Sequence, residues 1–179
     1  MEETLKQKRD EIVRGWIEAA LAIFPVEART FFANVADPFA NPAGCTISTE
    51  IGRLFDAVAR DAPDEELDPP LDRIVQITCL QDAAPSQGIA FVFALRETVR
   101  RALASARDER GVLEGLREFE PRIDRLALRA FDRHARLRQR IADLRVQEVR
   151  GRVSTLVKMA GMDWDDLPSS TRSQGDWGR

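Results

Sequence analysis

The sequence contains few of the residues from which catalytic and metal-binding sites are built. It has one histidine, His134, and two cysteines, Cys45 and Cys79, among 179 residues. The cysteines are far apart and belong to no CxxC motif, so we expect two reduced thiols rather than a zinc site or a redox pair. Neither a phosphate-binding loop nor a dinucleotide-binding glycine motif is present. The sequence therefore predicts a protein that is not an enzyme and that uses no cofactor and no metal.

Long apolar runs are missing as well. No stretch of about 18 apolar residues occurs, which excludes a transmembrane helix. The first residues include several acids and form no apolar segment of the kind found in secretory signals. We therefore expect a cytoplasmic protein that does not insert into a membrane.

Lysine is scarce, and arginine carries most of the basic charge. Of 27 basic residues, 24 are arginine. Residues 1–72 have a net charge of −8, and residues 73–179 have one of +5. Residues 122–152 contain ten arginines and four acids, but the arginines surround the whole predicted helix and follow no recognition motif. We therefore expect a solvated arginine face with intermolecular ion pairs and no nucleic-acid partner. The acidic cluster at 64–68 is expected in a solvated loop.

Apolar residues recur at helical spacing throughout the chain, and no convincing strand alternation occurs. A loop is expected over 37–49, with Ser48 as the N-cap of the next helix, and an acidic, proline-rich loop over 61–70. Phe31 and Phe32 are expected on the inner side of their helix. The predicted helices cover 4–24, 26–35, 49–60, 71–80, 85–106 and, after a start at 112, 122–160. The fold class is therefore all-α, with about six to seven helices and a very long C-terminal helix.

Two apolar stripes follow one another along the last predicted helix. The proximal stripe is expected to face the domain core and consists of Leu137, Ile141 and Leu144. A step of two residues then turns the distal stripe toward the opposite face; it consists of Val146, Val149, Val153 and Leu156. In a monomer the distal stripe would be in water, so it predicts a homodimer held partly by this helix. The alternative is a bend at Gly151 that folds the distal stripe back onto its own domain.

The order of the elements also fits a globin-like arrangement, in which a late pair of long helices forms one wall of the core. A haem would need an axial histidine on the helix before that pair. The segment 71–80 contains no histidine, and His134 lies on the last helix. We therefore expect a structural role for His134 and a globin-like domain without haem. The predicted domain covers residues 1–161, and a polar tail follows over 162–179.

The turn before the predicted helix 85–106 is the best candidate for a functional surface. Pro85 fixes φ at the helix start, and the N–H groups of the first helical turn can bind an anion or a partner carboxylate. The predicted ligand- or partner-binding residues are Gln81, Asp82, Pro85, Ser86 and Gln87. The alternative is structural: Asp82 or Ala84 caps the helix, and Gln81 satisfies buried backbone groups.

Several segments together carry a family resemblance. They are Trp16 with the helix end Phe24–Pro25, the Asn41-Pro42-Ala43-Gly44 segment, the turn from Leu80 to Gln87 with Phe91 and Phe93 after it, and the closing segment from Leu144 to Arg150. In combination they resemble the family of N-terminal domains of the RsbT co-antagonist RsbRD. The resemblance covers residues 12–161, which is nearly the whole chain.

This resemblance implies a bacterial sensory or regulatory input domain of stress-response signalling, with a regulatory protein as partner. Family members often precede a STAS domain in stressosome-type proteins, and related input domains are dimeric, globin-like and free of haem. The chain ends shortly after its long helix, so the resemblance covers the input and no output domain. Two other functions stay open: a haem- or ligand-binding globin-like sensor of gas or redox state, and an accessory factor of a redox complex, since standalone members occur in anaerobic, sulfur-metabolising bacteria.

Overall fold

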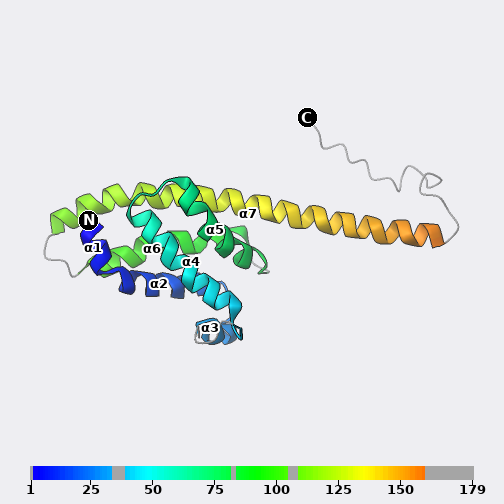
Figure 1. The fold of residues 1–179 in the computed structure, drawn as a ribbon, viewed down its shortest axis with the longest axis horizontal. Helices are drawn as coiled ribbons and strands as arrows, with labels where there is room; N and C mark the ends of the chain where they lie inside the picture. Colours follow the sequence, from blue (N-terminus) through cyan, green and yellow to red (C-terminus); the bar gives the residue numbers. More distant parts are fainter. Residues whose placement is uncertain (1, 34–38, 82–83, 105–108, 160–179) are drawn as a thin grey trace. The chain divides into compact units, whose positions relative to one another are not determined.

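The computed structural model describes residues 2–33, 39–81, 84–104 and 109–159 of the chain. This part contains seven α-helices and no β-strand (Figure 1). They are α1 (Glu2–Gln7), α2 (Arg9–Leu21), α3 (Val26–Ala33), α4 (Pro42–Ala59), α5 (Asp64–Cys79), α6 (Pro85–Leu103) and α7 (Glu109–Met159). The prediction of an all-α fold with a very long last helix is confirmed. None of the described helices has the length and apolar character needed to cross a membrane.

Residues 1–138 and residues 139–179 form two compact units, and α7 contributes to both. The first unit contains the hydrophobic core. Within it, α2 packs on α6 and α4 packs on α5. The indole N–H of Trp16 donates to the carbonyl of Phe91 over 2.7 Å and so joins α2 to α6. The largest fully buried side chains include Trp16, Leu54, Phe55, Leu95 and Phe119.

The first predicted helix, 4–24, is divided at Lys8 and ends at Leu21. Backbone hydrogen bonding continues through the division. Lys8 N donates to Thr4 O over 3.0 Å, and Ile12 N donates to Lys8 O over the same distance. The division is therefore a local change of backbone angles and not a separate turn.

The loop predicted over 37–49 is wrong in its second half, because α4 begins at Pro42. Asn41 is the N-cap, and its Oδ1 accepts a hydrogen bond from Gly44 N over 2.9 Å. Proline suits the first position of a helix, where no N–H donor is needed. Ser48 consequently lies inside α4 and caps nothing.

The acidic, proline-rich loop predicted over 61–70 is also wrong, because α5 begins at Asp64. Three acidic residues occupy the first turn of α5, where the helix dipole favours negative charge. Pro69 and Pro70 lie inside the helix, and Pro70 is buried. Interior prolines remove backbone hydrogen bonds, so α5 depends on tertiary contacts for its stability.

Those contacts include an array of ion pairs with α7, which we call the Arg–Asp ladder. It comprises Asp61, Asp64, Asp68 and Asp72 on one side and Arg125, Arg129 and Arg133 on the other. Arg125 Nη2 lies 3.1 Å from Asp61 Oδ1. Arg129 pairs with both Asp64 and Asp68, and Arg133 reaches Asp68 and Asp72 over 2.6 Å each. The expectations of a solvated acidic loop and of a solvated, intermolecularly paired arginine face are therefore wrong for these residues.

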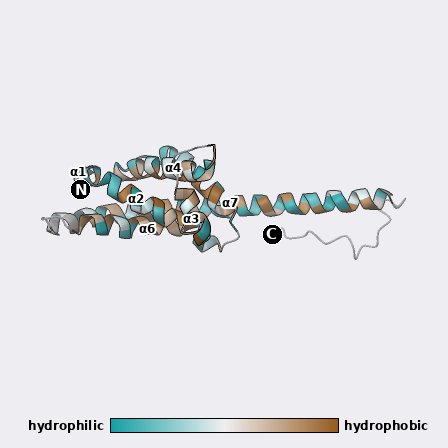
Figure 2. Ribbon diagram, turned by 90° about the horizontal axis from the view of Figure 1, so that it is seen from below, coloured by the Kyte–Doolittle hydropathy of each residue, from teal (hydrophilic) through white to brown (hydrophobic). Residues whose placement is uncertain are grey.

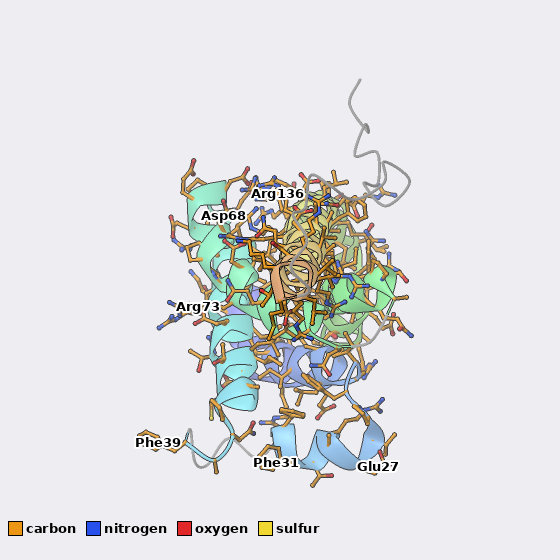
Figure 3. All side chains as sticks on the ribbon, turned by 90° about the vertical axis from the view of Figure 1, so that its right-hand side faces the viewer. Glu27, Phe31, Phe39, Asp68, Arg73 and Arg136 are labelled. Carbon is orange, nitrogen blue, oxygen red and sulfur yellow. The ribbon has the colours of Figure 1, made fainter. Side chains whose placement is uncertain are left out.

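Helix α3 contains no fully buried residue. The ring of Phe32 packs on that of Phe24, with 4.1 Å between the ring centroids. Phe31 is 53% exposed, so the expectation that it faces inward is wrong. Figure 3 shows Phe31 on α3 and Phe39 close to the start of α4, where Phe39 is almost fully exposed.

The structure describes residues 139–159 of the second unit, all of them in α7. The helix is continuous through Gly151, so the alternative of a bend there is wrong. Of the proximal stripe, Leu137 belongs to the first unit and packs against its core, and Leu144 belongs to the second unit and is 58% exposed. Figure 2 shows hydrophobic residues recurring between hydrophilic ones along 139–159. The predicted helix end at Gly161 and the predicted tail lie outside the described residues.

Candidate functional site

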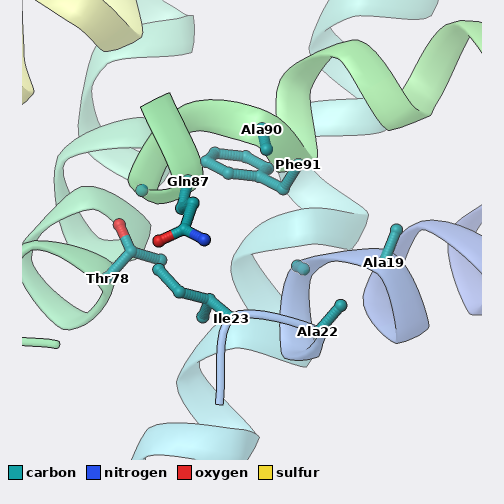
Figure 4. Close-up of a pocket in the computed structure, with 9 residues that line it drawn as sticks. Ala19, Ala22, Ile23, Thr78, Gln87, Ala90 and Phe91 are labelled. Carbon is teal, nitrogen blue, oxygen red and sulfur yellow. The ribbon is translucent and has the colours of Figure 1, made fainter. Parts of the chain in front are cut away.

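The turn singled out in the sequence borders a pocket in the first unit. The pocket lies between the C-terminal end of α2, the last turn of α5 and the first turns of α6, and its volume is about 200 Å³ (Figure 4). Most of its lining is apolar: Ala19, Ala20, Ala22, Ile23, Ala90 and Phe91. Gly88, Thr78 and Gln87 also line it. None of these described lining residues carries a charge.

Gln87 is the predicted site residue that reaches the pocket. Its Oε1 accepts a hydrogen bond from the backbone N–H of Ala84 over 3.0 Å. The Ala84 N–H can donate only to the oxygen of the Gln87 amide, and this fixes which end of the amide is Oε1 and which is Nε2. The two hydrogens of Nε2 then point elsewhere. Nε2 has no hydrogen-bond partner among the described residues, and Figure 4 shows the amide in the space between Thr78 and Ile23.

The other predicted turn residues are arranged differently. Gln81 is half-buried, and its Nε2 donates back to Ile77 O over 3.4 Å. Pro85 and Ser86 are exposed, and Asp82 lies outside the described residues.

The start of α6 already satisfies several of its own donors. Gln87 N and Gly88 N both donate to Ala84 O, over 2.9 and 3.2 Å. The Ala84 N–H is held by the Gln87 side chain. This helix start therefore offers fewer N–H groups to an anion than the sequence suggests, and the pocket beside it is the more developed feature.

Helix α7 touches α6 at Gly88, which also lines the pocket. A Cβ at Gly88 would lie 2.5 Å from Nε2 of His134, so only glycine allows this approach. His134 is buried, with only 4% of the residue exposed, which fits the structural role expected for it. Burial lowers the pKa of His134 below its ordinary value, and the charge of Arg138 lowers it further.

The sequence analysis singled out Gln87 on the α6 side of this pocket but neither Ala19 nor Ala20 on the α2 side. Alanines carry no chemical signal, and those of α2 become a lining only when the packing of α2 on α6 leaves space over them. The tertiary contact through Trp16 and Phe91 creates that arrangement.

No metal site accompanies the pocket in the described part of the chain. No group of three histidine, cysteine, aspartate or glutamate side chains is placed there to hold an ion. No disulfide joins Cys45, which is half-buried, to Cys79, which is buried. Burial raises the pKa of the Cys79 thiol.

The distal stripe is a second candidate site, in the second unit. Its members are exposed by 50% (Val146), 60% (Val149), 38% (Val153) and 65% (Leu156). Arginines flank it on both sides. Arg152 pairs with Glu148 of the same helix over 2.6 Å, whereas Arg145 and Arg150 have no ion-pair partner among the described residues.

Comparison with known proteins identifies the family of this chain. Residues 10–149, more than half of the chain, match the model of the RsbT co-antagonist protein rsbRD N-terminal domain. The match includes the pocket and extends into the distal stripe. Comparison with curated proteins found no match, and comparison with solved structures found none either. The chain belongs to the family of rsbRD N-terminal domains, which are regulatory domains.

Proposed function

We propose that this chain is a non-enzymatic, cytoplasmic sensory input domain of the stressosome type, which binds a ligand or a regulatory protein and forms a homodimer. Membership of a regulatory family supports this proposal. The observation that carries it is the row of exposed valines and leucine on α7, which has the spacing of a helix-pairing surface.

The signal enters at the turn and its pocket. The proposed binding residues are Gln81, Asp82, Pro85, Ser86 and Gln87. Gln87 supports the assignment most directly, because its amide faces a pocket whose described lining residues are all uncharged. Gly88 joins the pocket to His134 of α7, so a change in the pocket acts on the helix that bears the distal stripe.

The distal stripe pairs with the distal stripe of a second copy. Steps of three, four and three residues place Val146 and Val153 at a positions and Val149 and Leu156 at d positions of a heptad. β-branched residues at a with leucine at d favour two-stranded coiled coils. Each side chain contributes roughly 1.5–3 kcal/mol when it is buried, and a dimer buries eight of them.

Two charged substitutions at the d and a positions test this pairing. We expect Val149→Glu with Val153→Glu to give a folded monomer in light scattering, while the wild-type chain is a dimer. Both side chains are exposed in the single chain, so the substitution leaves its fold intact. Gln147→Glu with Ser154→Glu is the matched control, since it adds the same charge at b positions and should stay dimeric. A Val149/Val153 variant that remains a dimer, or a control that also becomes a monomer, contradicts the proposal.

A further inference from the structure

We propose that the pocket between α2, α5 and α6 binds a small, uncharged, mostly apolar molecule about the size of a substituted benzene ring, held by one hydrogen bond from Gln87 Nε2 to an acceptor on the molecule. The inference rests on the sensory function proposed above and names the chemical class of its ligand.

The size of the pocket sets the size of the ligand. Its volume is about 200 Å³. An apolar protein cavity of about 150 Å³ is known to take up benzene. The additional space accommodates a substituent of a few atoms, and the exposed lining residues Ala22, Gln87 and Ala90 show that the pocket is open to solvent on one side.

The lining sets the charge of the ligand. Alanines, one isoleucine and one phenylalanine supply most of the surface, and none of the described residues that line it is an arginine, lysine, aspartate or glutamate. A charged ligand would lose hydration there without gaining an ion-pair partner, which opposes its binding. Phe91 offers a ring against which a flat ligand can pack.

The polar groups set the position of the hydrogen bond. Gln87 Oε1 is occupied by Ala84 N, so the free part of the amide is a donor. The Thr78 hydroxyl donates to Val75 O over 3.3 Å, which commits its hydrogen within α5. The pocket therefore presents the Nε2 donor of Gln87 to the ligand, and a carbonyl oxygen is the matching acceptor.

Three probes of similar size separate these contributions: benzamide, benzoate and benzylammonium. We expect benzamide to shift the NMR signals of the Gln87 side-chain amide and of Gly88 in a saturable titration. We expect benzoate and benzylammonium to bind at least about tenfold more weakly, because each carries a charge into an uncharged lining. Charged probes that bind as tightly as benzamide, or the absence of saturable shifts with benzamide, overturn the proposal.

A substitution that keeps the helix cap but removes the donor tests the role of Gln87. Gln87→Glu retains an oxygen for Ala84 N and places a carboxylate opposite the acceptor of the ligand. We expect it to weaken the binding of acetophenone, which has a carbonyl acceptor like benzamide but no N–H donor, by about tenfold or more without lowering thermal stability. The matched control is Gln76→Glu on the exposed side of α5, which should leave the affinity unchanged. Equal affinities for the two variants contradict the assignment of Nε2.

Filling the pocket gives a second, independent test. Ala22 lines the pocket and is exposed, so Ala22→Phe can occupy the space without disturbing the core. It should abolish the benzamide shifts, whereas Ala135→Phe on the exposed side of α7 should preserve them. Persistence of the shifts in Ala22→Phe places the probe elsewhere and overturns the proposal. If these tests fail while light scattering still shows a dimer, the ligand class is wrong and the proposed dimer is unaffected. The dimer itself is tested by the substitutions in the distal stripe.

Discussion

A single buried amide, that of Asn41, joins two helices of the first unit. Its Oδ1 accepts from Gly44 N at the start of α4. Its Nδ2 donates to Phe31 O over 2.8 Å and to Phe32 O over 3.0 Å near the end of α3. A Cβ on Gly44 would lie 2.1 Å from Phe32 O, so the close approach of the two helices also depends on glycine there.

We expect Asn41→Ala to lower the free energy of unfolding by about 2 kcal/mol or more, because it removes a helix cap and leaves two carbonyl groups without a donor. Asn41→Ser keeps a capping oxygen and loses the donors, so its stability should lie between those of wild type and Asn41→Ala. Urea unfolding of the three proteins measures this order. Equal stabilities for wild type and Asn41→Ala would contradict the joining role.

The buried imidazole of His134 makes stability depend on pH. Burial and Arg138 lower its folded-state pKa below the ordinary value of 6.5. The unfolded chain therefore binds a proton more readily than the folded one, and this contribution to stability is present above about pH 6.5 and lost as the pH falls through the folded pKa.

We expect a higher free energy of unfolding at about pH 7.5 than at about pH 5.5, measured by urea unfolding. His134 is the only histidine of the chain, so His134→Gln provides the matched control and should flatten the dependence within this window. A pH dependence that is equally steep in the variant would assign it to other groups.

At the scale of the element, the Arg–Asp ladder joins α5, whose interior prolines remove backbone hydrogen bonds, to α7. The side chains of Arg129 and Asp68 are only 24% and 29% exposed, so their pairing is screened less than that of surface ions. Arg129 Nε donates to Asp68 Oδ1 over 2.9 Å, and the guanidinium reaches Asp64 as well.

We expect a double-mutant cycle of Arg129→Ala and Asp68→Ala to give a coupling of more than about 1 kcal/mol in the free energy of unfolding. The more exposed pair Lys8–Glu11, 3.0 Å apart, is the control and should give about 0.5 kcal/mol or less. Equal couplings for the two pairs would mean that the ladder contributes no more than a surface ion pair.

Local composition predicted which helices exist better than where they begin. Helical spacing of apolar residues was sufficient for the all-α fold and for the long last helix. The starts of α4 and α5 could not be found in this way, because the Asn-Pro sequence at the start of α4 and the Pro-Asp sequence at the start of α5 favour loops and helix starts alike. Asn41 is committed to a helix by contacts with α3, and α5 by contacts with α7, and both are tertiary.

In the candidate site, too, the features with a local sequence signal could be predicted, and those that depend on tertiary packing could not. Gln87 could be singled out because proline and glutamine at a helix start carry a local signal. The alanines of α2 could not, because their role depends on which helix packs over them. The spacing of apolar residues was sufficient to predict that the distal stripe shares one face of a helix, because all its members belong to the continuous helix α7.

At the scale of the whole molecule, the charges beside the distal stripe bear on self-association. Residues 139–159 contain five basic and two acidic residues, a net charge of +3. Arg145 and Arg152 occupy g positions and Arg150 an e position, so paired copies bring like charges together. Repulsion of this kind opposes the dimer and is weakened by salt.

We therefore expect the dimer to become tighter as NaCl rises from about 0.05 to about 0.5 M, measured by sedimentation equilibrium. Arg150→Gln removes one charge from each copy and should tighten the dimer at low salt more than at high salt. A dimer that weakens with salt would show that the arginines contact acidic groups of the second copy.

The spacing of the Arg–Asp ladder also restricts how α7 can move along α5. On α5 the aspartates of the ladder recur every four residues from Asp64 to Asp72, on α7 the arginines recur every four residues from Arg125 to Arg133, and Asp61 precedes α5. A slip of α7 by one residue would separate the arginines from their present partners. A slip by one full turn would bring two of the three arginines opposite the aspartates that now pair with their neighbours. We therefore expect any sliding of α7 along α5 to occur in whole-turn steps, between discrete registers.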